Sequence, residues 1–300
     1  MHKRTKTALL LASFFLLALL FSPPYFIAAI ISTISLLAYY EWLTLIQAKR
    51  YVRNYFFGML LFLMVVLAFY SNQNLTVIIN STYLIFWLII SLDIILGSNL
   101  TQQLLRKIPV LVGLFVILFS WYLLLSFNAS SSTIINDSQG LLFSKVSFED
   151  NLNYYFILLF VLVSLADTSA YICGKKFGSI PLAKKISPGK TLEGFLSSLL
   201  IPSVIIYFSL SYLFNMPILI VDFLFILLCC AYCTVGDLFI SILKRNNNVK
   251  NSGELFRFDN LRNKPEDIST AELLPGHGGI LDRIDSYFSV IPIFQLWLFL

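Results

Sequence analysis

Charged residues are scarce in this sequence of 300 residues. Asp, Glu, Lys and Arg together make up only 12% of it, about half of the roughly 25% that is usual in soluble proteins, whereas 58% of the residues are hydrophobic. A water-soluble domain of this size cannot bury so much apolar surface in its core. The composition therefore excludes a soluble enzyme and a disordered chain. The unbroken apolar runs argue against a membrane β-barrel, whose strands alternate polar and apolar residues. An all-α integral membrane protein is predicted.

Cysteine is also rare, and its placement argues against a disulfide framework. The four cysteines, Cys173, Cys229, Cys230 and Cys233, all lie in apolar stretches. Cys230 and Cys233 have C-x-x-C spacing, but no second pair and no cluster of histidines accompanies them. We interpret them as small buried side chains rather than as metal ligands or a redox pair.

The uncharged runs are long enough to cross a membrane several times. No charged residue occurs from 7 to 40 or from 54 to 92, and polar or proline-containing segments at 22–24 and 71–74 divide these runs. The basic start MHKRTK is followed by an apolar run without a convincing cleavage site, so we predict a retained helix rather than a signal peptide. About nine spans of roughly 20 residues are predicted, at 7–22, 25–46, 54–70, 76–97, 108–127, 154–173, 192–214, 218–243 and 281–300.

Lysine and arginine are almost absent from one side of this topology. When the loops between the nine predicted spans are assigned alternately to the two sides, 20 of the 21 basic residues fall on one side and only Lys145 falls on the other. The positive-inside rule then places the N-terminus in the cytosol and the C-terminus outside. The net charge of +5 is explained by this topology, and no nucleic acid partner is indicated.

The same topology divides the chain into three parts. Residues 1–127 are predicted to form about five N-terminal transmembrane helices, and residues 128–153 an external loop. Residues 154–300 are predicted to form a catalytic membrane domain of about four spans, with cytosolic segments at 174–191 and 244–282. Much of the charge of the chain lies in these two segments, so we expect the chemistry there.

Acidic side chains inside a bilayer are costly, so each one in a predicted span requires a reason. They are Glu41, Asp93, Asp167, Glu193, Asp222 and Asp237. Asp222 is predicted to reach water at the external end of its span. Asp93 is predicted to be solvated at the interface or paired with Arg106 or Lys107. Glu41 lies near a cytosolic end, where anchoring at the interface and a functional role both remain open.

The end of the eighth predicted span places three polar side chains on one helix face. Asp237, Ser241 and Lys244 have i, i+4, i+7 spacing, which brings a carboxylate, a hydroxyl and an ammonium group to the same side of a helix. A snorkelling lysine beside a structurally paired aspartate is the alternative. The spacing favours a functional site.

The strongest motif is the glycine-rich stretch PGHGGILDRIDS at 275–286. Glycines allow backbone amides to approach an anion closely, and the N-terminus of a helix favours negative charge. Asp282 and Asp285 are predicted to share one face of the first turn, where their oxygens suit a hard cation such as magnesium. Magnesium together with Lys and Arg side chains suits nucleotide phosphates. An N-capped helix is the structural alternative, and His277 is as consistent with a loop hydrogen bond as with catalysis.

A third cluster surrounds the segment 174–191. It contains Asp167 in the motif DTSAY, then GKKFG, and then ISPGKTLEG at 186–194. GKT suggests a P-loop, but the upstream glycine pattern and the preceding strand are missing. We predict instead a turn at 187–191 that leads into the seventh span, with Glu193 in the first turn of that helix. Positive-inside topology explains the lysines of this cluster equally well.

With these motifs the chain resembles the phosphatidate cytidylyltransferase family, also called CDP-diacylglycerol synthases. The matching residues are SILKR at 241–245, Lys250, SG at 252–253, PGHGGILDRID at 275–285 and the DTSAY and ISPGKTLEG stretches. The resemblance covers roughly 155–300 well, whereas the first half matches only as a set of hydrophobic spans. Two departures stand out: Asn251 replaces an aspartate of the family, and the 21 residues 254–274 replace a much shorter gap.

The resemblance implies transfer of a cytidylyl group from CTP to phosphatidic acid, which gives CDP-diacylglycerol and pyrophosphate for phospholipid synthesis. It assigns catalysis to Asp237, Asp282, Asp285, Lys244 and Arg283, with the three aspartates as ligands of Mg²⁺ and of a second metal ion if two are used. It assigns substrate binding to Ser241, Arg245, Lys250, His277, Gly278, Gly279, Asp167, Lys190 and Glu193. CTP and the membrane lipid would meet at the cytosolic face of a bacterial inner membrane, and a homodimer is consistent with the family.

Three alternatives stay open. The acceptor could be another lipid phosphate, such as an isoprenoid one, because apolar grooves tolerate many tails. An anion transporter would require polar residues near the midplane of the membrane, whereas here they gather at one face. A catalytically inactive relative is suggested by Asn251 and by the 254–274 insertion.

Overall fold

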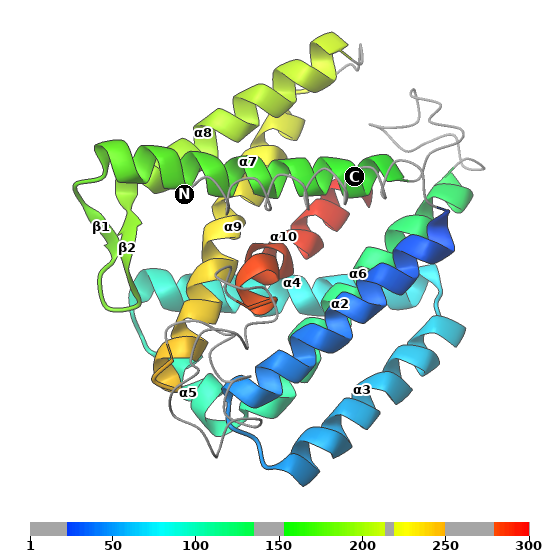
Figure 1. Cartoon of the computed structure of the whole chain (residues 1–300). Helices are drawn as coiled ribbons and strands as arrows, with labels where there is room; N and C mark the ends of the chain where they lie inside the picture. The colour runs from blue at the N-terminus through cyan, green and yellow to red at the C-terminus, as the bar shows by residue number, and fades with distance from the viewer. Residues whose placement is uncertain (1–22, 135–152, 214–218, 250–278, 300) are drawn as a thin grey trace, which may run out of the picture.

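The computed structural model describes residues 23–134, 153–213, 219–249 and 279–299 (Figure 1). Its helices are α2 (Pro24–Leu45), α3 (Arg50–Phe69), α4 (Gln73–Leu96), α5 (Leu100–Lys107), α6 (Pro109–Ile134), α7 (Asn153–Phe177), α8 (Leu192–Phe208), α9 (Ile220–Asn246) and α10 (Leu281–Phe299). A π-helical turn, η1 (Ser209–Leu213), extends α8. The strands β1 (Pro181–Ala183) and β2 (Ser187–Thr191) form an antiparallel hairpin. The predicted helical class is confirmed, with this hairpin as an addition.

Seven of these helices are long and apolar enough to cross a membrane: Tyr25–Leu45, Arg50–Phe69, Gln73–Leu96, Pro109–Phe127, Tyr155–Phe177, Leu192–Tyr212 and Ile220–Asn246. They correspond to the second to eighth predicted spans, and the protein is an integral membrane protein. The first predicted span lies outside the described residues. α6 continues into the predicted external loop as far as Ile134, and most of that loop also lies outside the described residues.

The ninth predicted span corresponds to α10, which is not among these seven helices. α10 lies in the middle of the bundle, among α4, α6, α7 and α9 (Figure 1). Its first two turns carry Asp282, Arg283 and Asp285, which make the helix less apolar than the others. Because protein surrounds α10, these polar turns do not have to face lipid. The count of nine spans and the orientation of the termini stay predictions.

Asp93 connects α4 to α5, a short helix that the sequence analysis did not predict. The Asp93 side chain is 7% exposed, and its two carboxylate oxygens accept hydrogen bonds from the backbone amides of Leu100 and Thr101, each at 2.8 Å. The backbone amides in the first turn of a helix have no hydrogen-bond partner within that helix, and a carboxylate at this place supplies one. The prediction of a solvated or lysine- or arginine-paired Asp93 is therefore wrong, because the carboxylate is used to cap α5.

Asp222, in the first turn of α9, is also buried, with 3% of its surface exposed. One carboxylate oxygen accepts a hydrogen bond from the indole Nε1 of Trp297 at 2.9 Å, and the other accepts from the backbone amide of Leu219 at 2.8 Å. The prediction that this carboxylate reaches water is wrong. It caps α9 and ties the start of α9 to the end of α10.

Replacing Asp222 with Ala is expected to destabilise the protein by about 2 kcal/mol, because the buried indole N–H and the helix terminus both lose an acceptor. Thermal unfolding of the purified protein in detergent measures this loss. Trp297→Phe removes the donor instead, so the double variant should be destabilised by less than the sum of the single variants. Strictly additive losses would show that the two side chains do not interact.

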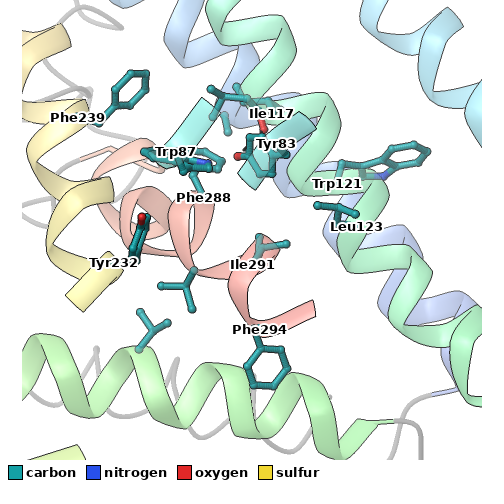
Figure 2. Packing of buried hydrophobic residues seen from close by; sticks show 14 of the residues in the cluster. Tyr83, Trp87, Ile117, Trp121, Leu123, Tyr232, Phe239, Phe288, Ile291 and Phe294 are labelled. Atoms are coloured by element: carbon teal, nitrogen blue, oxygen red, sulfur yellow. Dashed lines mark hydrogen bonds between the residues drawn. The ribbon is translucent and has the colours of Figure 1, made fainter. Parts of the chain in front are cut away.

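An aromatic core holds the helices of the second half against those of the first (Figure 2). The Tyr83 hydroxyl of α4 is 2.7 Å from the Ser120 hydroxyl of α6, and the rings of Trp87 and Phe239, on α4 and α9, are 5.2 Å apart. α10 adds Phe288, Ile291 and Phe294 to the same cluster. Aromatic pairs of this kind contribute beyond the area that they bury, so α4, α6, α9 and α10 pack together around one core.

Candidate functional site

A cavity of about 440 Å³ lies between α7, α8, α9 and the β hairpin. Three of the predicted site residues line it: Asp167 from α7, Lys190 from β2 and Asp237 from α9. The crossing of α7 and α8 beside the cavity depends on glycine, since a Cβ on Gly194 would lie 2.8 Å from the carbonyl oxygen of Ala170. Close helix packing thus brings together residues from three separate motifs.

Lys190 and Asp237 form an ion pair at this cavity. Lys190 Nζ lies 2.5 Å from Asp237 Oδ2, and the two side chains are 22% and 35% exposed. Ser241, one turn further along α9, donates a hydrogen bond to Asp237 Oδ1 at 3.5 Å. Asp237 and Ser241 therefore share one face of the helix, as their spacing predicts, and Asp237 remains accessible to a ligand in the cavity.

Asp285 is buried where α10 packs against α9. It is 7% exposed, and its carboxylate lies within electrostatic range of Asp167, Asp237 and Lys190. Asp285 Oδ1 accepts a hydrogen bond from the backbone amide of Ser286 at 2.8 Å, and the Ser286 hydroxyl donates to Asp167 Oδ1 at 3.3 Å. We call Asp167, Lys190, Asp237 and Asp285 the inner cluster. It combines three carboxyl groups with one amino group.

Lys244 and Asp282 form a second ion pair, which we call the outer pair. Lys244 Nζ donates to Asp282 Oδ1 at 2.7 Å, and the side chains are 15% and 17% exposed. Lys244, two turns beyond Asp237, thereby joins α9 to the first turn of α10. The i, i+3 spacing predicts that Asp282 and Asp285 act at one place. In the structure, however, Asp282 pairs with Lys244 and Asp285 belongs to the inner cluster.

The three aspartates that were predicted as metal ligands lie at two places in the structure, and their role as ligands stays a prediction. In the parts of the chain that the structure describes, no three His, Cys, Asp or Glu side chains lie close enough together to hold a metal ion. Asp237 and Asp282 each face a different lysine. The predicted trio of Asp237, Asp282 and Asp285 is thus divided between the inner cluster and the outer pair.

The β hairpin takes the place of the turn predicted at 187–191. β2 leads directly into α8, where Glu193 occupies the first turn as predicted. However, Glu193 is not among the residues that line the cavity. Its carboxylate accepts hydrogen bonds from the backbone amide of Ser179 at 3.0 Å, from the Ser179 hydroxyl and from the Ile180 amide at 3.2 Å. Glu193 therefore holds the start of the hairpin against α8.

The remaining predicted residues lie around the edge of this arrangement. Arg245 Nε donates to the carbonyl oxygen of Ile186 at 3.2 Å, which fastens the hairpin to α9. Gly279 is buried just before α10, and Arg283 is exposed on its first turn. Lys250, His277 and Gly278 lie outside the described residues.

Two contributors to the site were not predicted as site residues. Ser286 links Asp167 to the start of α10, and although it ends the stretch PGHGGILDRIDS, nothing in that pattern assigned it a role. Glu41 contacts the same helix terminus from the first half of the chain. Its only signal is an acidic residue in an apolar span, and the partner cannot be read from the sequence.

Comparisons with known proteins identify relatives of this chain. A family model described as the cytidylyltransferase family matches residues 2–257 and 269–300. The phosphatidate cytidylyltransferase of Haemophilus influenzae is 26% identical over 319 residues, which cover 100% of this chain and 99% of the relative. Those of Staphylococcus aureus (strain COL) and Staphylococcus haemolyticus are 37% identical over 149 residues, which cover 48% of this chain and 49% of each relative. The chain belongs to the cytidylyltransferase family.

The family model also matches the first half of the chain, in which the sequence analysis found hydrophobic spans but no motif. The resemblance was clear only from about residue 155 onward, whereas the family model begins at residue 2. The segment that the family model leaves unmatched, 258–268, falls inside the predicted insertion 254–274. This insertion and Asn251 lie outside the described residues.

Proposed function

We propose that this enzyme transfers a cytidylyl group from CTP to phosphatidate, which gives CDP-diacylglycerol and pyrophosphate. The family is one of cytidylyltransferases, and the relatives described above are phosphatidate cytidylyltransferases by name. The observation that carries the proposal is the inner cluster. Four segments of the sequence meet there, beside a cavity, and supply three carboxyl groups and one lysine.

In the proposed reaction an oxygen of the lipid phosphate attacks the α-phosphorus of CTP, and pyrophosphate leaves. Both reactants are anions, so the protein must offset negative charge where they meet. Lys190 and Lys244 are held in place by their ion pairs with aspartates. When phosphates bind, the two ammonium groups would exchange carboxylate oxygens for phosphate oxygens. Arg283, exposed on the first turn of α10, would contact the pyrophosphate.

A magnesium ion fits this arrangement if CTP supplies part of its coordination. At nucleotide sites Mg²⁺ is commonly bound by one or two carboxylates together with substrate phosphates rather than by a set of protein ligands alone. The inner cluster has more carboxyl groups than amino groups, and this composition favours a cation. Asp237 and the neighbouring Asp285 would hold the ion, which when bound would neutralise charge on the reacting oxygens.

We further propose that the site faces the cytosol at a bacterial inner membrane. CTP is dissolved in water and the phosphate of the lipid lies at the depth of the head groups, so the two meet only near an interface. Exposed lysines lie on the last turn of α7, where Lys175 also lines the cavity, and on the hairpin, namely Lys175, Lys176, Lys184 and Lys185. The positive-inside rule assigns such a basic surface to the cytosol. A homodimer stays a prediction from the family resemblance.

Incubation of the purified protein in detergent with labelled CTP, phosphatidate and Mg²⁺ is expected to give labelled CDP-diacylglycerol and an equal amount of pyrophosphate. A parallel series with isoprenoid phosphates tests the alternative acceptor. Preference for an isoprenoid phosphate would change the acceptor and retain the reaction class. If folded protein yields no labelled lipid from any acceptor, the proposed function is wrong.

A further inference from the structure

We propose that Glu41 is a positioning residue of the active site, through which the N-terminal helices fix the place of Asp282 and Asp285. The proposal rests on the function proposed above. Glu41 lies on α2, and 0% of its surface is exposed. Its Oε2 accepts hydrogen bonds from the backbone amides of Ile280 at 2.7 Å and Leu281 at 3.3 Å, which are 239 and 240 positions further along the chain.

These two amides belong to the start of α10. The first N–H groups of a helix have no partner within the helix, and a carboxylate that accepts from them also interacts favourably with the helix dipole. Glu41 thus supplies from a distant helix the cap that a residue next to the helix usually provides. Asp282 follows Leu281 directly and Asp285 comes three residues later, so a contact that fixes this first turn also fixes the outer pair and the inner cluster.

The end of α2 that carries Glu41 is itself held firmly. Besides Glu41, four large side chains at this end are 0% exposed: Tyr39, Trp42, Leu43 and Leu45. Trp42 Nε1 donates to the carbonyl oxygen of Pro109, at the start of α6, at 2.9 Å. A Cβ on Gly113 would lie 2.4 Å from that indole nitrogen, so α2 and α6 are in close contact. A carboxylate on such a backbone can hold its partner within about 0.5 Å, as a positioning residue must.

A contact made only for stability would not require a carboxylate. Apolar side chains could join α2 to α10 without the desolvation that a buried charge requires. The carboxylate adds direction, because it fixes the two backbone amides in place.

Asp93 provides a matched comparison. It is also a buried carboxylate on a helix that could span the membrane, and it accepts from the amides of Leu100 and Thr101 at the start of α5. α5 carries none of the predicted site residues. The two caps therefore allow a cap beside the predicted site residues to be compared with one on a helix that carries none of them.

The test compares Glu41→Ala, Glu41→Gln and Asp93→Ala in the full-length protein in detergent. Backbone amide hydrogen exchange, kcat and the KM for CTP are measured for each. In Glu41→Ala we expect faster exchange at residues 280–285 and a kcat lowered about 100-fold, the loss typical of a misplacement of about 1 Å, with little change in KM. Glu41→Gln keeps one acceptor oxygen and should recover most of the lost kcat. Asp93→Ala should exchange faster at residues 100–104 and keep the kcat of the wild type per folded molecule.

The proposal is overturned if Glu41→Ala keeps the kcat of the wild type, or if Asp93→Ala loses as much kcat as Glu41→Ala. Where Glu41→Ala does not fold, Glu41→Asp takes its place: its shorter side chain withdraws the acceptor from the two amides and should lower kcat, and a wild-type kcat in Glu41→Asp overturns the proposal. A wild-type protein without activity on any lipid phosphate would overturn the proposed function instead. In that case backbone amide hydrogen exchange at residues 280–285 is the test of the role of Glu41. Faster exchange in the Glu41 variants supports the positioning role, and unchanged exchange overturns it.

Discussion

Replacing Asp237 with Asn is expected to lower kcat for CDP-diacylglycerol formation by about 100- to 1,000-fold, the range seen when one preorganised electrostatic contact to a transition state is removed. The substitution keeps the shape of the side chain and removes its charge. That charge holds Lys190 at 2.5 Å and, in the proposed reaction, helps to hold the cation that accompanies CTP. Initial rates with labelled CTP, at saturating concentrations of both substrates, measure the effect.

Asp222→Asn is the matched control for this variant, because it removes a carboxylate from the other end of the same helix. Asp222 is buried and bonded to Trp297 and to the backbone, and it does not line the cavity. It should lower the temperature of unfolding while leaving kcat per folded molecule unchanged. Equal kcat values in Asp237→Asn and Asp222→Asn would remove Asp237 from the site.

The spans were predictable because hydrophobic length is a local property of the sequence. The predicted spans 25–46 and 218–243 reappear as α2 and α9, with ends shifted by a few residues at most. α10 was less predictable as a span, since it is covered by protein and has a polar first turn. The hairpin was also missed, because its two strands are short and depend on contacts with α8 and α9 that the local sequence does not contain.

Spacing along a helix predicted part of the arrangement of the candidate site, and packing between helices determined the rest. The i, i+4 spacing of Asp237 and Ser241 correctly placed both on one face of α9. The i, i+3 spacing of Asp282 and Asp285 did not show that they serve different partners, because that division depends on how α10 packs against α9. Spacing within a helix fixes the relative directions of side chains, but the neighbouring helix determines what each one meets.

The partners of the buried acids were also not predictable from the sequence. A carboxylate in an apolar span indicates that a partner is needed, and Glu41, Asp93 and Asp222 all have one. In each case the partners include backbone amides at the start of a helix. Backbone amides are present at every position, so no residue type in the sequence identifies which of them is bound.

Gly236 sets the distance between α9 and α10, so its replacement by Ala is expected to reduce both stability and activity. A Cβ at this position would lie 2.3 Å from the carbonyl oxygen of Asp285 and 2.6 Å from Ser289 Oγ, and the backbone of α10 would have to move. In an unhindered helix interior Gly→Ala stabilises by about 1 kcal/mol. Here overpacking reverses the sign, and we expect a net loss of about 1–2 kcal/mol.

The same displacement would move Asp285 and Ser286 away from Asp167, so we expect kcat to fall about 100-fold as well. Gly58→Ala on α3 is the control, because nothing lies within 4 Å of a Cβ built there. It should keep the kcat of the wild type and unfold at the same temperature or a slightly higher one. If Gly236→Ala behaves like Gly58→Ala in both measurements, the contact between α9 and α10 does not set the geometry of the inner cluster. If Gly236→Ala loses stability but keeps kcat, the reaction tolerates a displacement of α10, and the expected dependence of kcat on the position of Asp285 is wrong.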